Sequence, residues 1–585
     1  MELWGSCIVG GKYSFQPDNG EHKNQVTVIQ GEKDMEENQE LMALYDVRGI
    51  QDYIFRTTKV KDAMGASRCV ENLLMEALKQ AVKDYNEENE TKQISCDAIK
   101  WKDEEKELPF LTEWKPMQVL YEGGGNAYVL YESRELYLYM NKKISRYILN
   151  NTYSLQLSVA CVEKTKDYLL DYMNLNQEMA RVKARQIQSK PYGALPIMQT
   201  ELDTGFPMAN PIEWDGKTLG GSTETQQKKK HKNWDEDKDD KIFDNLIQKK
   251  GIDSTLAVVH LDGNNMGMRI QQYLSEEKDY VKAVNRMRQI SFQINQSYKM
   301  VFEKMYQKFD SGDTSLLIKG KEKDCFIRKI IIAGDDITYV CNGYLAMATV
   351  EFFIREIENC HIIRNDTKNP GDAESAFRVC AGIAYMGSHF PFHVAYDTAE
   401  ECCKSAKERA KKLENQWNNM AGSFVDFQIC RNIFSRDLER ARKEEYTTWM
   451  GESLIRRPYF VETEKNKVIF REAAKNHSFQ QFKKAVDYFQ NEENIPRRFA
   501  KEIQDTYAMG EEQMAPLGAF LSSRKMQLPF DEKDTKDKRA SFFDEQGAKW
   551  YDALEMMDLY LDLDRDICME ERTNEQISNK NNTSE

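Results

Sequence analysis

Residues 330–340 read Ile-Ile-Ile-Ala-Gly-Asp-Asp-Ile-Thr-Tyr-Val. Two short apolar runs flank the polar centre Gly334-Asp335-Asp336, a pattern typical of two antiparallel strands joined by a tight turn. The strands are expected at residues 329–333 and 337–341. This hairpin would place two carboxylates side by side at the tip of a sheet.

The elements around this hairpin follow the order strand, helix, hairpin, helix, strand. That order is the signature of the ferredoxin-like fold, in which the helices cross over between strands of one sheet. A further strand at 423–429 is expected to extend the sheet. The predicted elements outside the hairpin are a strand at 256–262, helices at 277–309 and 345–358, a strand at 377–385 and a helix at 395–413.

The same order occurs earlier in the chain, so the module appears twice. The earlier hairpin has Gly123-Gly124-Gly125 between its two strands. Its other elements are expected as strands at 41–47 and 155–162 and helices at 66–85, 133–149 and 164–188. The fold class is therefore α+β, with two ferredoxin-like domains whose antiparallel sheets carry helices on one face, followed by a helical C-terminal region. The two sheets could meet through their open faces or their hairpin tips.

This duplication divides the chain into six segments. Residues 216–250 are polar and rich in charge runs, with too few apolar side chains to bury, and are expected to form a flexible linker. The lysines 228–230 are interpreted as part of a solvated loop rather than as a phosphate contact. The segments are an N-terminal extension (1–40), a first domain (41–190), an inter-domain segment with the linker (191–250), a second domain (251–430), a helical domain (431–570) and a disordered tail (571–585).

Composition excludes several classes of protein. The 585 residues are 41% hydrophobic and 30% charged, which is typical of globular chains, and 82 basic against 96 acidic residues give a net charge of −14. A protein that coats nucleic acid is therefore not expected, although a local basic patch remains open. No apolar run could cross a bilayer and no signal peptide is visible, which predicts a cytoplasmic protein without membrane contact. The twelve cysteines include no C-x-x-C pair and the seven histidines no H-E-x-x-H, so neither a zinc ribbon nor a zincin site is predicted.

Three carboxylates carry the predicted chemistry. Asp262 ends a buried strand and is followed by Gly263, while Asp335 and Asp336 occupy the hairpin turn. In this fold the first strand and the hairpin are neighbours in the sheet, so the three acids could meet. Such like charges repel one another unless a cation lies between them, and two Mg²⁺ or Mn²⁺ ions beside substrate phosphates would provide it. This arrangement predicts nucleotidyl transfer.

Two structural interpretations compete with it. An Asp-Asp pair in an acidic protein is by itself most often just a turn. A calcium loop starting at Asp262 is disfavoured, because Met266 and Tyr273 stand where that loop needs oxygen ligands.

The first copy of the module retains one of the three acids. Asp46 stands where Asp262 stands, and Gly123, Gly124, Gly125 and Asn126 stand where the hairpin 333–336 stands. A single carboxylate should not hold two metal ions, but a glycine-rich hairpin lets a nucleotide approach the backbone closely. We therefore expect one catalytic site and one binding site.

These motifs resemble the large palm-domain subunit of type III CRISPR effector complexes. The first palm of that family opens with D-x-x-G-I-Q-x-F-I and a G-x-S, and the second carries D-x-D-N-L-G, G-G-D-D and a spaced tail of small residues. The matching stretches here are Asp46 to Phe55, Gly65-Ala66-Ser67, Asp262 to Gly267, Ala333 to Asp336, Ala381 to Ala384, Pro391, Ala395, Ala399-Glu400 and Ala406-Lys407. The resemblance covers both domains, about residues 41–429.

The resemblance implies that the second palm joins ATP molecules into cyclic oligoadenylates, second messengers of antiviral defence. Asp262, Asp335 and Asp336 would then be the catalytic metal ligands, Gly263 and Gly334 would give the substrate room, and Lys407 would reach a triphosphate. The second nucleotide site would comprise Ser67, Gly123, Gly124, Gly125 and Asn126. The implied cofactors are two Mg²⁺ or Mn²⁺ ions, with ATP as substrate.

Some residues depart from the pattern of the family. No HD nuclease motif is present, the zinc-binding cysteines are missing from 194–211, and Asn264 replaces the second Asp of D-x-D. The departures favour a stand-alone or divergent relative, so RNA and a CRISPR ribonucleoprotein are open as partners beside nucleoside triphosphates, and the oligomeric state stays open.

Two alternative functions follow from the same residues. A diguanylate cyclase shares the palm, but Asp336 and Ile337 occupy the last two positions of its G-G-[DE]-E-F hairpin. The other is a nucleotide-binding scaffold or sensor that has lost turnover, which the degenerate first palm and Asn264 favour.

Overall fold

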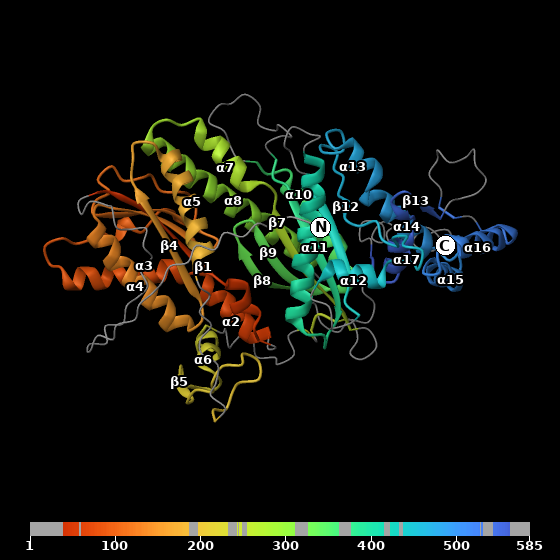
Figure 1. Ribbon diagram of the computed structural model, residues 1–585, viewed down its shortest axis with the longest axis horizontal. Coiled ribbons are helices and arrows are strands. Elements are labelled where there is room, and N and C mark those ends of the chain that lie inside the picture. Colours follow the sequence, from red (N-terminus) through yellow and green to blue (C-terminus); the bar gives the residue numbers. More distant parts are fainter. Residues whose placement is uncertain are drawn as a thin grey trace, which may run out of the picture.

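The computed structural model describes most of the two ferredoxin-like modules and the C-terminal region (Figure 1). The predicted tail 571–585 and residues 1–38 of the predicted N-terminal extension lie outside the described residues. The described ranges are 39–57, 60–186, 197–231, 243, 245–247, 254–310, 326–361, 376–414, 422–431, 437–526, 528–529 and 542–561.

The first domain is a four-stranded sheet in the order β2-β3-β1-β4, with every neighbouring pair antiparallel. This is the strand order of the ferredoxin-like fold, as predicted. Its strands are β1 (Leu41–Arg48), β2 (Met117–Gly123), β3 (Asn126–Tyr131) and β4 (Gln156–Glu163). Its helices are α1 (Ile50–Phe55), α2 (Val60–Glu71), α3 (Leu73–Glu88), α4 (Arg134–Thr152) and α5 (Tyr168–Arg185).

The second domain repeats this order and adds two strands at one edge. Its sheet runs β12-β11-β10-β7-β9-β8, so β10-β7-β9-β8 corresponds to β4-β1-β3-β2. The predicted additional strand is confirmed, because β11 pairs in parallel with β10. The strands are β7 (Thr255–Gly263), β8 (Ile327–Ala333), β9 (Asp336–Asn342), β10 (Val379–Gly387), β11 (Phe424–Ile429) and β12 (Tyr459–Phe460). The helices are α7 (Met266–Ser275), α8 (Tyr280–Phe309), α10 (Ala346–Ile357) and α11 (Phe392–Glu414).

Helices cover both faces of the second sheet. Alternate residues of β7 divide between two cores, since Val259 and Leu261 pack with α8 and α10, while Leu256 and Val258 pack with α11. The prediction placed helices on one face, and the crossover helices α8 and α10 do lie there. The helix that follows the last strand of the module, α11, lies on the other face.

Gly382 of β10 allows the backbone of α11 to pack closely against this strand. A Cβ at this position would lie 1.9 Å from the backbone oxygen of Ala399 and 2.4 Å from the backbone nitrogen of Cys403. The helix backbone therefore rests directly on the strand.

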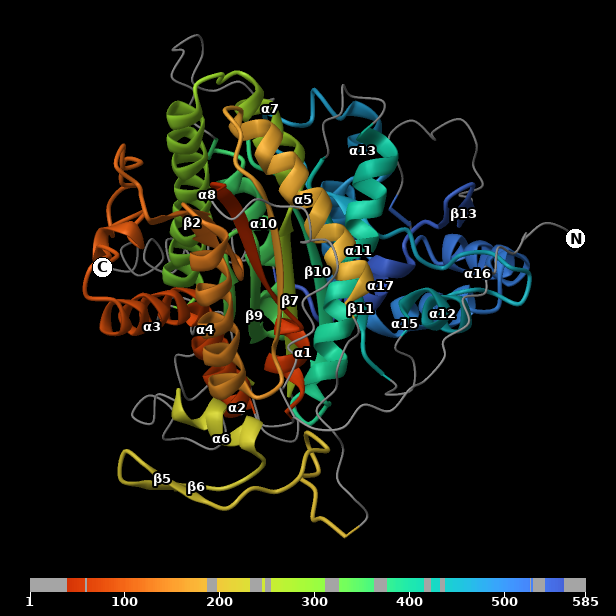
Figure 2. The same cartoon turned by 60° about the vertical axis from the view of Figure 1, so that its left-hand side comes forward.

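The two domains pack against each other through matching contacts. Each hairpin has a bulge, at Leu120 in β2 and at Ile330 in β8. Ser67 of α2 donates a 2.6 Å hydrogen bond to the carbonyl oxygen of Ile330, and Arg288 of α8 donates one of 2.6 Å to that of Leu120. Helix α8 thus runs beside β2 of the other domain (Figure 2). In each domain, therefore, a helix donates a hydrogen bond to the hairpin bulge of the other domain, and the two contacts are related by an approximate two-fold axis.

Part of the predicted flexible linker is folded, which corrects the sequence-based expectation for residues 216–231. Strands β5 (Ile212–Trp214) and β6 (Lys217–Leu219) form a hairpin and α6 (Thr223–Lys230) follows it. Lys228 is not solvated: its side chain is fully buried and pairs at 2.7 Å with buried Glu224, which Arg56 also contacts. Ion pairing replaces the apolar burial that the composition lacks, and sequence composition alone does not reveal that pairing.

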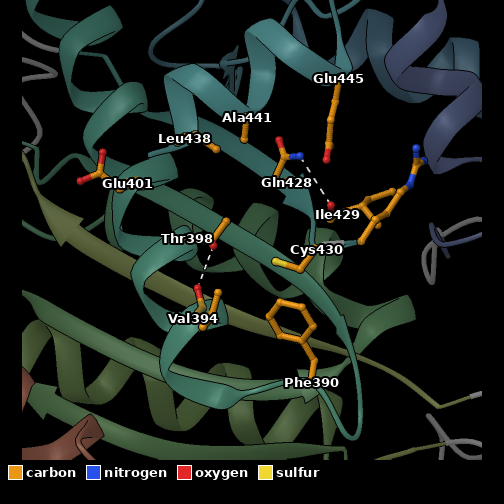
Figure 3. A pocket seen from close by; sticks show the side chains of 11 residues that line it. Phe390, Val394, Thr398, Glu401, Gln428, Ile429, Cys430, Leu438, Ala441 and Glu445 are labelled. Atoms are coloured by element: carbon orange, nitrogen blue, oxygen red, sulfur yellow. Dashed lines mark hydrogen bonds between the residues drawn. The ribbon is translucent and has the colours of Figure 1, made fainter. Parts of the chain in front are cut away.

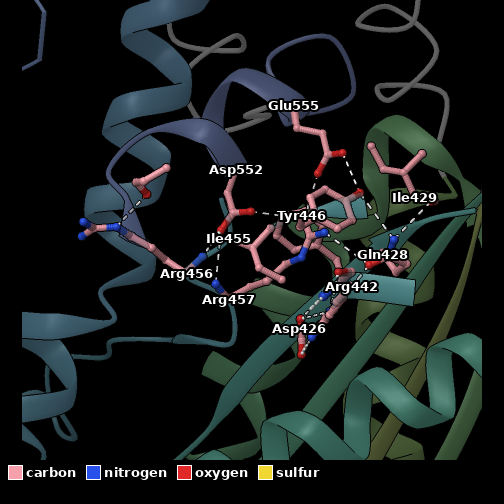
Figure 4. Close-up of polar contacts among 12 residues, drawn as sticks. Asp426, Gln428, Ile429, Arg442, Tyr446, Ile455, Arg456, Arg457, Asp552 and Glu555 are labelled. Atoms are coloured by element: carbon pink, nitrogen blue, oxygen red, sulfur yellow. Dashed lines mark hydrogen bonds and ion pairs between the residues drawn. The ribbon is translucent and has the colours of Figure 1, made fainter. Parts of the chain in front are cut away.

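The C-terminal region is mainly helical, as predicted, and joins the edge of the second sheet. Its centre is a buried ionic network in which Arg457 pairs with Asp552 at 3.2 Å and Glu555 at 2.9 Å, while Arg442 pairs with Asp426 of β11 (Figure 4). No helix in the described ranges has the length and apolar character needed to cross a bilayer. The helices are α12 (Leu438–Glu445), α13 (Arg471–Asn476), α14 (Phe479–Gln490), α15 (Arg497–Tyr507), α16 (Glu511–Ser523) and α17 (Tyr551–Met556), with a short pair β13 (Phe543–Asp544) and β14 (Gly547–Ala548).

Candidate active site at the tip of the second sheet

The sheet register brings the three predicted acids together. Asp262 near the end of β7 is the direct partner of Asp336, the first residue of β9. Asp335 occupies the turn before it, where Gly334 adopts a positive φ of 67°. The first strand of the module, β7, is therefore adjacent to the hairpin strand β9 in the sheet, as predicted.

Gly263 provides the space that Asp335 occupies. A Cβ on Gly263 would lie 2.7 Å from Oδ2 of Asp335 and 2.8 Å from the hydroxyl oxygen of Tyr298. Any larger residue would push the carboxylate out of the site. Gly263 thus permits the close packing of Asp335 against the end of β7.

The acids destabilise one another's charged forms. Burial, and then the negative charge of Asp262, raise the pKa of Asp335 to about 6. Burial, followed by the charges of Asp262, Asp335 and Glu400, raises the pKa of Asp336 to about 7. Mutual effects of this kind require that the three carboxylates face a common space. Glu400 of α11 is a fourth acid of this space that the sequence analysis did not single out for a role.

Lys407 lies at the acids rather than on a solvated helix face. Its ammonium forms an ion pair with Oδ2 of Asp262. Burial lowers the pKa of Lys407, but the charge of Asp262, the hydrogen bond to that carboxylate and the nearby thiols of Cys403 and Cys380 together outweigh the effect of burial and leave the pKa raised. The lysine is therefore a permanent positive charge beside the carboxylates.

A cleft of about 310 Å³ opens next to this cluster. The loop after β7 forms one side, and the end of α11 forms the other. Its lining residues are Gly263, Asn264, Asn265, Met266, Gly267, Asp335, Lys407, Ala410 and Lys411. The cleft thus combines a carboxylate, two lysines one turn apart and an open backbone loop, which suits a phosphorylated ligand.

The donor chemistry suits a hard divalent cation. Oδ1 of Asp336 is buried and has no hydrogen-bond partner among the described residues. Carboxylate oxygens are the preferred ligands of Mg²⁺ and Mn²⁺. In the described part of the chain, no three His, Cys, Asp or Glu side chains already converge as a preformed metal cluster, and Asp262 is held by Lys407.

His260 lies beside Asp336 inside the sheet. Its Nδ1 lies 3.0 Å from the hydroxyl of Thr338 and 3.5 Å from Oδ1 of Asp336. Burial lowers the pKa of His260 to about 4 in spite of the charge of Asp262. The imidazole is therefore neutral, and its hydrogen bond is made with Thr338 rather than with Asp336.

Asn264 has a structural role, which explains the departure from D-x-D. It is 5% exposed, and its side-chain NH₂ donates to the carbonyl oxygen of Gly422 at 2.9 Å. A carboxylate could not donate this hydrogen bond. Asn264 thus fastens the loop after β7 to the chain entering β11.

The first domain reproduces the geometry without the hairpin acids. Asp46 of β1 faces Asn126 of β3, just as Asp262 faces Asp336. Gly124 and Gly125 have φ values of 60° and 81°, which disfavour an acid in the turn, and Gly125 packs against Ile50. The predicted correspondence between the hairpins 123–126 and 333–336 is confirmed by the pairing of their end residues.

Lys183 of α5 was missed by the sequence analysis. Its ammonium pairs with Asp46, as Lys407 pairs with Asp262. A sequence signal was present, since Lys-x-Arg occurs at 183–185 and at 407–409, in the helix after the last strand of each module.

Ser67, by contrast, contacts the strand β8 of the second domain through Ile330. The structure therefore places it between the two domains, while Gly125 and Asn126 lie with Asp46.

Another cavity lies along α11 and shares no residue with the acidic cleft (Figure 3). Phe390, Thr398, Cys430 and Glu445 are among the residues that line it, and its volume is only about 40 Å³. It is too small for a nucleotide.

Comparison with known proteins identifies chains of similar fold. Residues 255–416 match the family model of the Cas10/Cmr2 second palm domain. Among solved structures, a Csm1-Csm4 cassette in complex with cA4 has a TM-score of 0.50 at 12% identity, covering 89% of this chain and 70% of that one. Csm1 of T. onnurineus has a TM-score of 0.48 at 12% identity, with coverages of 89% and 69%. A search of the curated proteins found no match.

Proposed function

Since residues 255–416 match the family model of the Cas10/Cmr2 second palm domain, we propose that this chain is a metal-dependent nucleotidyltransferase. It condenses nucleoside triphosphates, ATP foremost, into a cyclic or linear oligonucleotide messenger of CRISPR-type antiviral defence. The observation that carries the proposal is the acidic cluster of Asp262, Asp335 and Asp336 beside a lysine-lined cleft.

Asp262, Asp335 and Asp336 would hold the Mg²⁺ or Mn²⁺ ions. When bound, the metal would polarise the phosphoryl oxygens and favour loss of the proton from the attacking 3′-hydroxyl. The raised pKa values of Asp335 and Asp336 fit this role, because a cation relieves the repulsion that raises them.

The remaining residues of the cleft bind and orient the triphosphate. Lys407 and Lys411 offer two ammonium groups one helical turn apart on the wall of the cleft. The turn at Gly334 lets the phosphates approach the backbone, because a Cβ there would meet nothing within 4 Å. Once a metal ion neutralises the carboxylate of Asp262, the ammonium of Lys407 can leave that carboxylate and pair with a phosphate.

The first palm is proposed to bind a second nucleotide without metal. Asp46 is already neutralised by Lys183, and Gly125 and Asn126 replace the hairpin acids. Ser67 would act at the boundary of this site, from the contact between the two domains.

The partner is proposed to be a type III CRISPR ribonucleoprotein or its RNA. The solved structure of similar fold is a Csm1-Csm4 cassette, and its ligand, cA4, suggests the class of product to look for. We propose the same class of product here.

The proposal is tested by incubating the purified chain with ATP and Mg²⁺ or Mn²⁺, with and without candidate RNA activators. Chromatography should detect pyrophosphate and 2′- or 3′-linked products. Asp336→Asn should abolish them, while Asp84→Asn, which removes only an ion pair with Lys143 between α3 and α4 of the first domain, should leave them unchanged. Absence of product from the unaltered chain under every condition would refute the enzymatic function.

One observation favours a second candidate, a nucleotide-binding scaffold or sensor. The ammonium of Lys407 already forms an ion pair with Asp262, so the negative charge of the acidic cluster is partly neutralised without metal. The scaffold would bind ATP in the same assay and release no pyrophosphate.

A further inference from the structure

The hydroxyl of Tyr298 lies beneath the acidic cluster without a hydrogen-bond partner among the described residues. Tyr298 is on α8 and is 0% exposed, and its ring packs against Phe353 and Phe377. A buried hydroxyl without a partner is less favourable than the same ring without the hydroxyl. Packing alone would therefore prefer phenylalanine at this position.

The nearest acidic group to this hydroxyl is identified by the geometry at Gly263. The position of a Cβ on Gly263 lies 2.8 Å from the Tyr298 hydroxyl and 2.7 Å from Oδ2 of Asp335. The two oxygens are therefore separated by at most the sum of these distances, and Gly263 leaves the space between them open. A small rotation of the Asp335 side chain, or one bridging water, would complete a hydrogen bond.

The direction of such a bond follows from the two groups, because a phenol is protonated at neutral pH and an ionised carboxylate can only accept.

We propose that Tyr298 is a positioning residue whose hydroxyl donates a hydrogen bond to Asp335 and holds that carboxylate toward the cleft. The proposal rests on the proposed function, in which Asp335 binds a divalent ion. Tyr298 itself touches neither the ion nor the nucleotide. It acts from below the sheet tip, through Asp335.

The first test compares Tyr298→Phe with Tyr385→Phe in the full chain. Tyr385 is a matched control, because it is also buried, lacks a hydrogen-bond partner for its hydroxyl among the described residues and lies in the same core. Binding of Mn²⁺ alone, followed by electron paramagnetic resonance of the free ion, should weaken about tenfold in Tyr298→Phe and stay unchanged in Tyr385→Phe. Tyr385→Phe should melt at or above the temperature of the unaltered chain, whereas Tyr298→Phe should melt below Tyr385→Phe because it also loses the hydrogen bond to Asp335. Unchanged Mn²⁺ affinity in Tyr298→Phe would overturn the proposal.

The second test needs no metal, so it separates this proposal from the proposed function. With 3-fluorotyrosine at position 298, the ¹⁹F resonance should shift when Asp335→Ala is introduced and stay in place with Asp84→Asn. A resonance that ignores Asp335→Ala would overturn the hydrogen bond. If the unaltered chain binds no Mn²⁺, the metal-dependent function fails, and the ¹⁹F comparison still decides whether Tyr298 and Asp335 are bonded.

Discussion

Lys183 and Lys407 occupy equivalent positions in the two palm domains. Each lies fifteen residues after the first residue of its helix, α5 or α11, and each pairs with the aspartate near the end of the first strand of its domain. The lysine–aspartate pair is thus common to both modules. What distinguishes them is the hairpin, which has Asp335 and Asp336 in one domain and Gly125 and Asn126 in the other. We therefore expect metal at one tip only.

Asp335→Ala should reduce product formation at least a hundredfold, because it removes a proposed metal ligand. The melting temperature should change little or rise, because the substitution removes a buried carboxylate that is repelled by the negative charge of Asp262. Product assays and calorimetry on the same preparation check this. A variant with a collapsed circular dichroism spectrum would show a structural rather than a catalytic role.

Lys407→Ala should raise the KM for ATP about tenfold or more, because it removes a charge-assisted contact with phosphate. Lys183→Ala is the matched change in the first palm. It should weaken binding of the second nucleotide and leave Mn²⁺ binding at Asp335 and Asp336 unchanged. Calorimetric titration with ATP, with and without Mn²⁺, distinguishes the two variants. Equal effects of both variants on Mn²⁺ binding would contradict the assignment of one metal site.

In the metal-free protein, Asp335 and Asp336 should contribute stability that is lost as the pH rises from about 5 to about 7.5. The folded-state pKa values of Asp335 and Asp336 are about 6 and about 7, above the usual value for aspartate, so the folded state binds more protons than the unfolded state in this range. Thermal melting at several pH values checks the slope. Asp336→Asn should flatten it, and Mg²⁺ should stabilise the protein more at the higher pH. A stability that rises with pH in the unaltered chain but not in Asp336→Asn would contradict these shifts.

Gly382→Ala should destabilise the second palm by about 3 kcal/mol, because its Cβ would collide with the backbone of α11. Gly387→Ala is a control on the same strand, since a Cβ there meets nothing within 4 Å. Chemical denaturation of the two variants measures the difference. Similar midpoints would show that α11 can move away from β10 at little cost.

Local patterns in the sequence predicted the hairpin, the strand order and the duplication. Glycine in a turn and alternation of apolar residues are short-range signals, and they are sufficient to specify each β-α-β-β-α-β unit. Once the order is known, the antiparallel register of that fold brings Asp262 opposite Asp336, which is why the acids could be predicted from positions more than 70 residues apart.

The inter-domain segment shows where this reasoning failed. Residues 223–230 have almost no apolar side chains, yet they form α6, because Lys228 and Glu224 bury their charges against each other and Arg56. The prediction of disorder from composition assumes that every charged side chain is solvated, and that assumption fails where two opposite charges are buried as an ion pair.

By itself, then, the sequence determined the strand-helix order of both palms, the three acids and the loss of two of them from the first copy. The tertiary structure decided that α11 covers the second face of its sheet, that Lys407 and Lys183 meet the aspartates, and that the buried hydroxyl of Tyr298 and the carboxylate of Asp335 both lie against Gly263. These features depend on how close two backbones come and on which charges share a buried space. Both are properties of packed surfaces between distant segments, which no local pattern along the chain records.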